Sequence, residues 1–455
     1  MQSILERVSV LDQQNRYEVM ITDLDHEGRG VGRLENGKAV FVEGALPTER
    51  VLLKIKKESH RFSIGKLLRV IEPSGDRVKP KCQHFGTCGG CALQHLAPEA
   101  QVAIKQRSLE QTLLRLGSVR PDVLLSPLYG ESWGYRYRAR LSVWYHPSWD
   151  RVLIGFRHKH SAIVLGLKEC PVLQASFSKL LPALEQLVYG LSIRNRIPQL
   201  EVAIPSLSAV SARIVLVLRI LDPLSETDQQ ALQQFADAHA IQWWLQPKGA
   251  ETAYPFYPLP APDRLAYELP DFDLQYDFFP VEFTQVNAPM NQVMVRRAIE
   301  ALKPKAGEFI IDFFCGLGNF TLPLARSGAN VLGLEGSSAL VERARENAQK
   351  QGLEHRARFD CMDLFKVDEA VLASWGTPSA ILLDPPRDGA MELVKALPNQ
   401  GYNRIVYVSC NPATLARDAG ILVNEKGYTL VAAGIMNMFP HTTHIESMAI
   451  FQREG

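Results

Sequence analysis

Residues 309–321, Phe-Ile-Ile-Asp-Phe-Phe-Cys-Gly-Leu-Gly-Asn-Phe-Thr, decide the fold class of this 455-residue chain. The apolar beginning of this stretch is typical of a buried strand, and the glycine-rich turn after it leads into a helical segment. The next expected strand, residues 330–334, ends at Glu335. Glycines let the backbone approach a ligand closely, and a carboxylate about 20 residues later can hold ribose hydroxyls. A dinucleotide site would have a third glycine where Thr321 stands, so the pattern favours S-adenosylmethionine over NAD.

Polar residues also follow the next two expected strands. Asp363 comes directly after one of them, and Asp384 follows the apolar run of residues 380–383 and precedes two prolines. In open α/β sheets, ligands bind at the carboxyl ends of the strands. We therefore expect Asn319, Glu335, Asp363 and Asp384 to line one crevice, with Asp363 at the adenine end of the cofactor.

Cys410 ends another expected strand of the same sheet, within Tyr407-Val408-Ser409-Cys410-Asn411-Pro412. A thiol there is either a small core residue or a nucleophile. Methyl transfer to oxygen or nitrogen needs no thiol, whereas carbon 5 of uracil is a poor nucleophile. A thiolate that adds to carbon 6 activates carbon 5, so Cys410 favours methylation of a uracil carbon.

Release of such an adduct requires a base that removes the proton from carbon 5. The segment Phe439-Pro-His441-Thr-Thr-His444-Ile-Glu446-Ser447 offers His441, His444 and Glu446, and the spacing does not choose among them. A metal site on the two histidines is a weaker interpretation, because no carboxylate partner is evident.

A second cysteine pattern indicates a metal centre. Cys82, Cys88 and Cys91 lie within ten residues that also contain three glycines, and Cys170, followed by proline, is the obvious fourth soft ligand. A four-cysteine zinc site and a redox Cys-x-x-Cys pair are the alternatives. The redox pair leaves Cys82 and Cys170 unexplained, and structural zinc sites more often pair two short Cys-x2–4-Cys hooks. We therefore favour an iron–sulfur cluster.

Two basic stretches suggest RNA contacts. Residues 14–72 have the alternation of a small β barrel, and within them residues 50–69 carry seven Lys or Arg and one acid, Glu58. Further on, Arg136, Arg138 and Arg140 alternate along an expected strand over residues 135–141, near several aromatic residues. The alternatives are a solvated strand face for the first stretch and arginines paired with acids for the second.

The composition limits what the chain as a whole can do. Lys and Arg number 50 against 49 Asp and Glu, giving a net charge of +1, so a surface for nucleic acid must be a local cluster. No apolar run approaches the roughly 18 residues of a membrane span, and the beginning lacks a secretory pattern. We expect a cytoplasmic protein with no membrane association, in which cysteines bind metal or react.

Five motifs together resemble the RNA uracil-5-methyltransferase family, and above all its branch that acts on bacterial 23S rRNA and carries a [4Fe-4S] cluster. They are Phe283-Thr-Gln285-Val-Asn287, residues 312–320, residues 383–387, residues 409–414 and His444-Ile-Glu446. The barrel resembles a TRAM domain, an OB-like module of RNA-modifying enzymes.

The resemblance implies that Cys410 is the nucleophile and Glu446 the base. It implies a cofactor site lined by Gln285, Phe314, Asn319, Glu335, Asp363 and Asp384. The cluster ligands would be Cys82, Cys88, Cys91 and Cys170, in a structural or RNA-positioning role. Close relatives carry Asn where Asp363 stands, and either residue can accept a hydrogen bond from the adenine amino group.

We therefore expect three domains. Residues 1–73 form a TRAM-like OB β barrel, residues 74–270 a mixed α+β domain with the cluster and RNA contacts, and residues 271–455 a Rossmann-like class I methyltransferase domain of α/β type. The expected function is S-adenosylmethionine-dependent C5-methylation of a uridine in 23S rRNA, free or partly assembled, by a monomer. The alternatives are the same reaction on tRNA, or a metal-containing RNA-binding protein without methyl transfer.

Overall fold

The computed structural model describes residues 16–207, 213–259, 264–398 and 402–453. The chain divides into two compact units. One comprises the residues up to 104 together with 440–443, and the other comprises residues 105–439 and those from 444 onward. The expected domain limits at 73/74 and 270/271 stay predictions. Among the described residues, no helix combines the length and apolarity that crossing a membrane requires.

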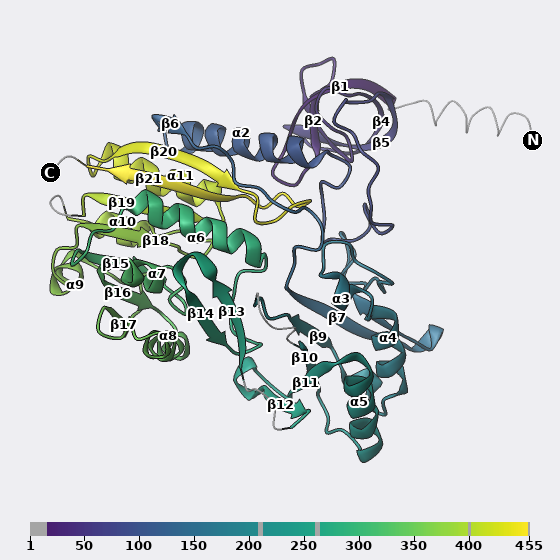
Figure 1. The fold of residues 1–455 in the computed structure, drawn as a ribbon. Coiled ribbons are helices and arrows are strands. Elements are labelled where there is room, and N and C mark those ends of the chain that lie inside the picture. Colours follow the sequence, from purple (N-terminus) through teal and green to yellow (C-terminus); the bar gives the residue numbers. More distant parts are fainter. Residues whose placement is uncertain (1–15, 208–212, 260–263, 399–401, 454–455) are drawn as a thin grey trace, which may run out of the picture. The chain divides into compact units, whose positions relative to one another are not determined.

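The first unit contains a closed β barrel, as the alternation of residues 14–72 predicts (Figure 1). Its strands are β1 (Arg16–Leu24), β2 (Gly30–Arg33), β3 (Ala39–Glu43), β4 (Arg50–Glu58) and β5 (Phe62–Glu72), in the order β1-β2-β3-β5-β4. Inward-facing Val19, Ile21, Val40 and Leu53 are fully or almost fully buried. A side chain at Gly32 would place its Cβ 2.4 Å from Val19, so the barrel closes only because this residue is glycine.

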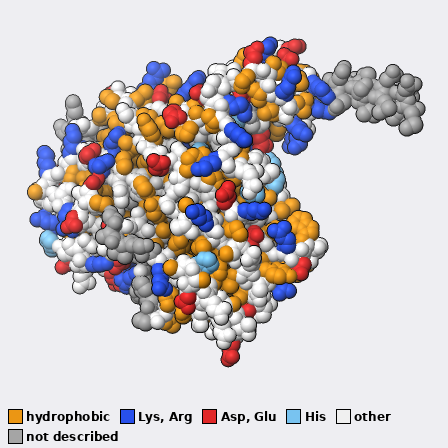
Figure 2. All heavy atoms as spheres, turned by 45° about the vertical axis from the view of Figure 1, so that its right-hand side comes forward, with side chains coloured by type: hydrophobic (Ala, Val, Ile, Leu, Met, Phe, Trp, Pro, Cys, Tyr) orange, Lys and Arg blue, Asp and Glu red, His pale blue; other side chains and the backbone are white. Residues whose placement is uncertain are grey.

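Basic side chains of the predicted RNA-binding stretch stand on the outside of this barrel. Lys56, Lys57, Lys66 and Arg69 are exposed, and Figure 2 shows Lys and Arg side chains over the barrel's visible face. Arg50 of the same stretch instead pairs with Glu72 across β4 and β5. The exposed cations are placed as the prediction of RNA-backbone binding requires.

The chain leaving the barrel is tied back by a buried ion pair. The carboxylate of Glu49 has no exposed surface and accepts hydrogen bonds from the backbone N–H of Leu46 at 2.8 Å and from Arg77 Nη2 at 2.8 Å. Burial opposes its charged form, but the hydrogen bonds outweigh that effect and hold the pKa of Glu49 below its usual value. Arg77 therefore anchors the linker that follows the barrel to Glu49 of the barrel.

The second unit contains two sheets and a two-stranded ribbon. The first sheet has the order β12-β11-β10-β9-β7-β8. Its elements and helices are β7 (Arg138–His146), β8 (Arg151–Gly155), α3 (Ala175–Ser178), α4 (Leu181–Gly190), β9 (Gln199–Ala203), β10 (Ile214–Arg219), α5 (Glu226–His239), β11 (Ile241–Gln246) and β12 (Tyr254–Tyr257). The ribbon pairs β13 (Leu265–Leu269) with β14 (Leu274–Phe278). The mixed α+β content expected for the middle of the chain is confirmed.

The arginine alternation forms only part of the predicted row. The strand begins at Arg138, whose guanidinium donates to the carbonyl oxygens of Pro280 and Glu282. Burial lowers the pKa of Arg138 to about 10, which still leaves it charged at neutral pH. Arg140 donates to Glu201 at 3.0 Å, but 68% of its side chain remains exposed. Pairing within the protein thus describes Arg138 and, in part, Arg140, and RNA contact by this strand stays a prediction.

The second sheet has eight strands in the order β17-β16-β15-β18-β19-β21-β20-β6 (Figure 1). The first five are mutually parallel, and β21 is antiparallel to both of its neighbours. The strands are β6 (Val123–Leu124), β15 (Phe309–Phe313), β16 (Asn330–Glu335), β17 (Ala357–Cys361), β18 (Ala380–Leu383), β19 (Arg404–Ser409), β20 (Thr429–Met436) and β21 (Glu446–Gln452). This is the Rossmann-like α/β arrangement that the sequence predicts.

Helices cover this sheet and complete its core. α6 packs on β18 and β19, and α11 packs on β19, β20 and β21. The helices are α2 (Pro98–Leu116), α6 (Ala288–Leu302), α7 (Thr321–Arg326), α8 (Ser338–Lys350), α9 (Glu369–Ser374), α10 (Met391–Ala396) and α11 (Pro412–Asn424).

Candidate active site

The predicted site residues follow the carboxyl ends of neighbouring strands. Phe313 of β15 pairs with Leu383 of β18, so Phe314 and Asp384 leave the sheet side by side. The backbone N–H of Asp384 donates to the carbonyl of Phe313 at 3.3 Å. On the other side, Phe313 pairs with Leu334, which precedes Glu335. Parallel pairing therefore collects side chains that are distant in sequence at one edge of the sheet.

The glycine-rich loop holds the carboxylate of Glu335. Phe314, Gly316 and Gly318 all have positive φ, at 65°, 56° and 88°, which folds the loop tightly over the end of β15. The N–H of Gly316 donates to Glu335 Oε2 at 3.2 Å, and the N–H of Ser337 donates to Oε1 at 2.9 Å. A carboxylate fixed in this way is placed to accept hydrogen bonds from ribose hydroxyls.

Asn319 belongs to a polar group that the sequence analysis missed. Asn319 and Asn291 form a reciprocal amide pair, with both hydrogen bonds at 3.0 Å, and Tyr267 donates its hydroxyl to Asn319 Oδ1 at 3.0 Å. Asn291 lies one helical turn after Asn287, the N-cap of α6. That spacing after the Gln285 motif could have indicated Asn291, whereas nothing in the local sequence marks Tyr267.

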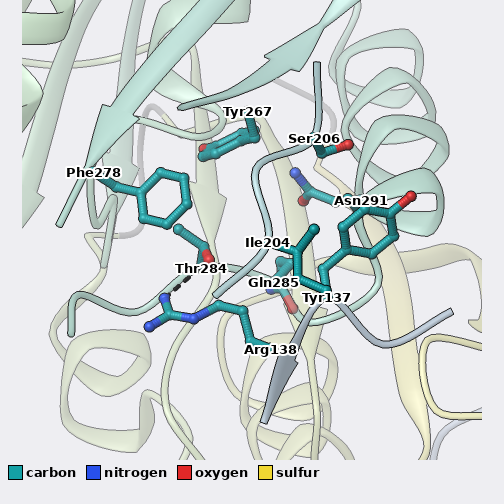
Figure 3. Close-up of a pocket in the computed structure, with 10 residues that line it drawn as sticks. Tyr137, Arg138, Ile204, Ser206, Tyr267, Phe278, Thr284, Gln285 and Asn291 are labelled. Atoms are coloured by element: carbon teal, nitrogen blue, oxygen red, sulfur yellow. Dashed lines mark hydrogen bonds between the residues drawn. The ribbon is translucent and has the colours of Figure 1, made fainter. Parts of the chain in front are cut away.

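The predicted residue Gln285 lines a pocket next to this amide pair (Figure 3). Figure 3 shows side chains from the start of β7, from the β13–β14 ribbon and from α6 converging on it; its lining residues are Tyr137, Arg138, Ile204, Ser206, Tyr267, Phe278, Thr284, Gln285, Ala288 and Asn291. Asn291 connects this pocket to the Asn319 end of the glycine-rich loop.

Asp363 stands on the loop after β17, as predicted. Its carboxylate is exposed, accepts the N–H of Phe365 at 3.2 Å and pairs with Lys366 at 2.9 Å. The Lys366 hydrogen bond holds the pKa of Asp363 below its usual value. The ring of Phe365 lies 5.9 Å from that of Phe314, so the loops after β15 and β17 both present an aromatic side chain beside Asp363.

The register of β19 and β21 brings Cys410 opposite Glu446. Ser409 pairs with Ser447 in the antiparallel ladder, and one step further along the same register Cys410 faces Glu446. Directly opposite residues of an antiparallel pair project from the same face of the sheet. Glu446 is 4% exposed, so its carboxyl group is enclosed beside the thiol.

Asp384 completes an enclosed acidic group with these two residues. Burial raises the pKa of Asp384 to about 7, although the residue keeps partial surface exposure. Burial and the neighbouring Asp384 raise the pKa of Glu446 well above its usual value. Burial, then Glu446 and Asp384, raise the pKa of Cys410 to about 11, and Arg387 acts in the opposite direction. The thiol is therefore protonated at neutral pH, and Glu446 is a stronger base than an ordinary carboxylate.

Two family models match this chain. The model described as tRNA (Uracil-5-)-methyltransferase matches residues 97–454, and the TRAM domain model matches residues 14–68. The chain belongs to the tRNA (uracil-5-)-methyltransferase family. S-adenosylmethionine is the methyl donor of this family, and the TRAM match coincides with the closed barrel of the first unit.

Relatives of similar length support this membership. A 23S rRNA (uracil(1939)-C(5))-methyltransferase RlmD from Aromatoleum aromaticum is 50% identical over 435 residues, covering 95% of this chain and 99% of the relative. RlmD from Thiobacillus denitrificans is 52% identical, covering 96% and 99%. The structure of Pyrococcus abyssi tRNA (uracil-54, C5)-methyltransferase in complex with S-adenosyl-L-homocysteine matches with a TM-score of 0.71 at 22% identity, covering 95% of this chain and 99% of that one. The fold is thus shared along the chain.

The two histidines near Glu446 in sequence, His441 and His444, have different surroundings from those of Glu446. His441 is buried in the first unit, where its Nδ1 lies 3.1 Å from Gln101 Nε2 and its carbonyl accepts the N–H of Ala92 and Leu93. His444 is exposed, and its Nδ1 lies 3.3 Å from Arg387 Nη2. Of the three predicted bases, Glu446 is the one placed against Cys410 by strand register.

The predicted cluster cysteines are divided between the two units. In the first unit, the N–H of Gly90 lies 3.4 Å from Cys88 Sγ, and burial together with the nearby Cys82 thiol raises the pKa of Cys88. In the second, the N–H of Cys170 donates to Ser178 Oγ at 2.8 Å. Across the described ranges, no three His, Cys, Asp or Glu side chains are arranged as a metal site. His441 and His444, the weaker metal-site interpretation, form no such group either.

The electrostatics of the thiol predict its chemical reactivity. Because only the thiolate is alkylated, the rate of iodoacetamide modification of Cys410 should rise roughly tenfold per pH unit until pH approaches the thiol's raised pKa. Arg387→Gln removes the charge that favours the thiolate and should slow modification at about pH 9 by roughly threefold. Peptide mass spectrometry measures Cys410 separately from the other cysteines.

Lys395→Gln is the matched control, because Lys395 is a cation on α10 that pairs with Glu392. It should leave the Cys410 rate unchanged. Equal rates in the two variants would show that Arg387 does not act on the thiol.

Proposed function

We propose that this protein transfers the methyl group of S-adenosylmethionine to carbon 5 of a uridine in 23S rRNA, with Cys410 as nucleophile and Glu446 as base. The observation that carries the proposal is the pairing of Cys410 with Glu446 across β19 and β21 beside Asp384. The substrate follows from relatives at 50–52% identity that are named for uracil 1939 of 23S rRNA. The proposed target is the equivalent uridine.

Each residue has a defined part in the proposed reaction. The Cys410 thiol gives its proton to water, and the thiolate forms a bond to uracil carbon 6, which places electron density on carbon 5. S-adenosylmethionine, which Glu335 and the glycine-rich loop would hold, would supply the methyl group to that carbon; its bond between sulfur and methyl breaks and S-adenosylhomocysteine is left. Glu446 in its ionised form then takes the proton from carbon 5, and the electron pair of that C–H bond restores the ring double bond as the carbon 6–sulfur bond breaks and the Cys410 thiolate is released.

Arg387 favours the addition of Cys410 to carbon 6, and burial of Glu446 favours removal of the proton from carbon 5. The guanidinium opposes the rise in the pKa of the Cys410 thiol, so it stabilises the thiolate needed for addition. Burial raises the proton affinity of Glu446, so this carboxylate can remove a carbon-bound proton more effectively than a solvated one.

The nucleophile is tested by substitution. Cys410→Ala should lower methyl incorporation into 23S rRNA by at least about four orders of magnitude, because the variant lacks the thiol that forms the adduct. Binding of S-adenosylmethionine should stay within roughly twofold of the parent, since Cys410 follows β19, three strands away from β16 and Glu335. Cys410→Ser preserves size and polarity and should be inactive as well. Activity in Cys410→Ala equal to the parent would overturn the covalent mechanism.

The same assay separates rRNA from tRNA. Purified 23S rRNA and tRNA are incubated separately with labelled methyl donor, and the modified base is mapped by nuclease digestion and mass spectrometry. Methylation of tRNA alone would favour the alternative substrate. RNA binding without methyl transfer to either would favour the non-enzymatic alternative.

Glu446→Gln should trap the methylated adduct. Glutamine keeps the size of the side chain but cannot take the proton from carbon 5, so the bond between Cys410 and carbon 6 persists. A protein–RNA band that resists denaturant should appear on gels and require both Cys410 and the methyl donor. Glu425→Gln, an exposed glutamate after α11, is the control and should turn over without such a band. A variant that binds cofactor and RNA but gives neither adduct nor loss of activity would exclude Glu446 as the base.

We also propose that Cys82, Cys88, Cys91 and Cys170 hold a [4Fe-4S] cluster. The chemistry of the donor set supports it: the sulfur of Cys88 receives a backbone N–H and interacts with the thiol of Cys82, as is usual around cluster sulfurs. Bound there, the cluster would link segments that are distant in sequence, and no reaction step passes through it.

Anaerobically purified protein should be brown, with broad visible absorption and equal amounts of iron and acid-labile sulfide. Cys88→Ala should lose the colour, whereas Cys361→Ala, which changes an exposed cysteine outside the ligand set, should keep it. A colourless preparation that contains zinc would reject the cluster in favour of a zinc site.

The remaining parts of the proposal concern the setting of the reaction. All proposed reacting groups come from one chain, which suits a monomer. An rRNA substrate, free or partly assembled, places the enzyme in the cytoplasm. The TRAM barrel, with its exposed Lys56, Lys57, Lys66 and Arg69, would contact the RNA backbone.

A further inference from the structure

An exposed aromatic stack lies at the tip of the β7–β8 hairpin, where a short 3-10 helix, Pro147–Trp149, joins the strands. Trp149 is 62% exposed, among the most exposed of the large apolar side chains that the structure describes. Its ring is parallel to that of His146, with centroids 4.0 Å apart and an interplanar angle of 7°. His146 in turn meets the edge of Trp144 at 4.6 Å. The tryptophan is supported by two further rings, although it is not buried.

The backbone and side chains around the tip fix this stack. Asp150 adopts a left-handed conformation with φ 45°, and its N–H bonds back to the carbonyl of Pro147. Its carboxylate accepts the hydroxyls of Tyr145 and Tyr189, both at 2.8 Å. The guanidinium of Arg194 lies over both tyrosine rings, at 5.1 and 5.4 Å. Little conformational entropy therefore remains to be lost when a ligand stacks on Trp149.

Two arginines lie near the stack. Arg151 directly follows the tip, opposite His146, and Arg194 lies over the tyrosines that bind Asp150. Asp150, the carboxylate at the tip, already accepts two tyrosine hydroxyls and faces Arg194. A supported aromatic face with a basic rim fits a nucleotide, because the base stacks on the ring while the phosphate meets the cations.

We propose that Trp149 is a stacking platform for an unpaired base of the RNA substrate, flanked by Arg151 and Arg194 as phosphate contacts. The inference rests on the proposed function for the identity of the RNA, but the platform and its binding can be tested without methyl transfer. An apolar protein partner fits less well, since the ring stands among basic and hydroxyl-bearing side chains.

The test measures binding of a fluorescein-labelled, unstructured oligouridine of about twelve nucleotides to the full-length protein by anisotropy. Trp149→Ala should weaken binding by roughly 5- to 30-fold, the loss typical of one stacked base. Trp149→Phe retains a ring and should lose less than about threefold. Tyr254→Ala removes an aromatic residue of similar exposure from β12 of the same sheet and should bind like the parent.

Two further measurements separate this inference from the proposed function. With 23S rRNA, Trp149→Ala should raise KM and leave kcat unchanged, because stacking contributes equally to substrate and transition state. If the parent methylates no RNA but oligouridine binding still depends on Trp149, the platform stands and the proposed function fails.

Three outcomes would overturn the platform. The first is an affinity of Trp149→Ala for oligouridine that lies within twofold of the affinity of Tyr254→Ala. The second is a fall in kcat with KM unchanged. The third is unchanged RNA affinity with altered self-association in sedimentation, which would assign the exposed ring to a contact between copies of this chain.

Discussion

The site depends on the pairing of β21 with β19. Five parallel strands collect Phe314, Glu335 and Asp384 at one edge, but a parallel sheet alone provides no partner for Cys410. The antiparallel β21 supplies one, because its register with β19 places Glu446 opposite the thiol. That register is fixed on both sides of β21, by the hydroxyl of Ser447 donating to the carbonyl of Ser409 at 3.0 Å and by the pairing of Glu446 with Met436 of β20. A slip of one residue would turn Glu446 to the opposite face of the sheet and leave a buried carboxylate without its acidic neighbours.

Enclosure of three proton-binding groups sets the chemistry of this edge. In water, a carboxylate with an ordinary pKa would be too weak a base to remove a proton from carbon. Burial raises the pKa of both Asp384 and Glu446, Asp384 raises that of Glu446 further, and both carboxyl groups raise the pKa of Cys410. The same enclosure disfavours the thiolate that must attack first. Arg387 opposes this effect, and because its side chain is exposed, water screens its influence on the thiol.

The sequence predicted the features that depend on local pattern. Apolar runs followed by glycine or acid identified β15, β16 and β18, the run before Ser409-Cys410 identified β19, and parallel pairing then dictated that the residues after them would meet. The choice of base was different, because it depends on a register between β19 and β21, more than thirty residues apart, which spacing does not encode. Tyr267 and Asn291 were missed because each belongs to a segment whose local pattern only indicates a strand or a helix. The alternation of arginines did not reveal the partners of Arg138 for a related reason: the groups that bind it lie about 140 positions further along the chain.

Those distant partners give Arg138 a structural role, because they tie the beginning of β7 to the segment between β14 and α6. Its guanidinium binds the backbone of residues 280–282 and reaches Thr284 at 3.1 Å, while the N–H of Tyr137 donates to the carbonyl of Val286 at 2.8 Å. Gln285, held between these contacts, is thereby presented to the pocket beside Asn291. The same strand, β7, continues to the hairpin that carries Trp149, about 30 Å away at the rise of an extended chain. One rigid strand therefore begins at the cofactor-side pocket and ends at the proposed RNA platform. A base stacked on Trp149 at one end of β7 would therefore lie at a fixed distance from the segment that positions Gln285 at the other end.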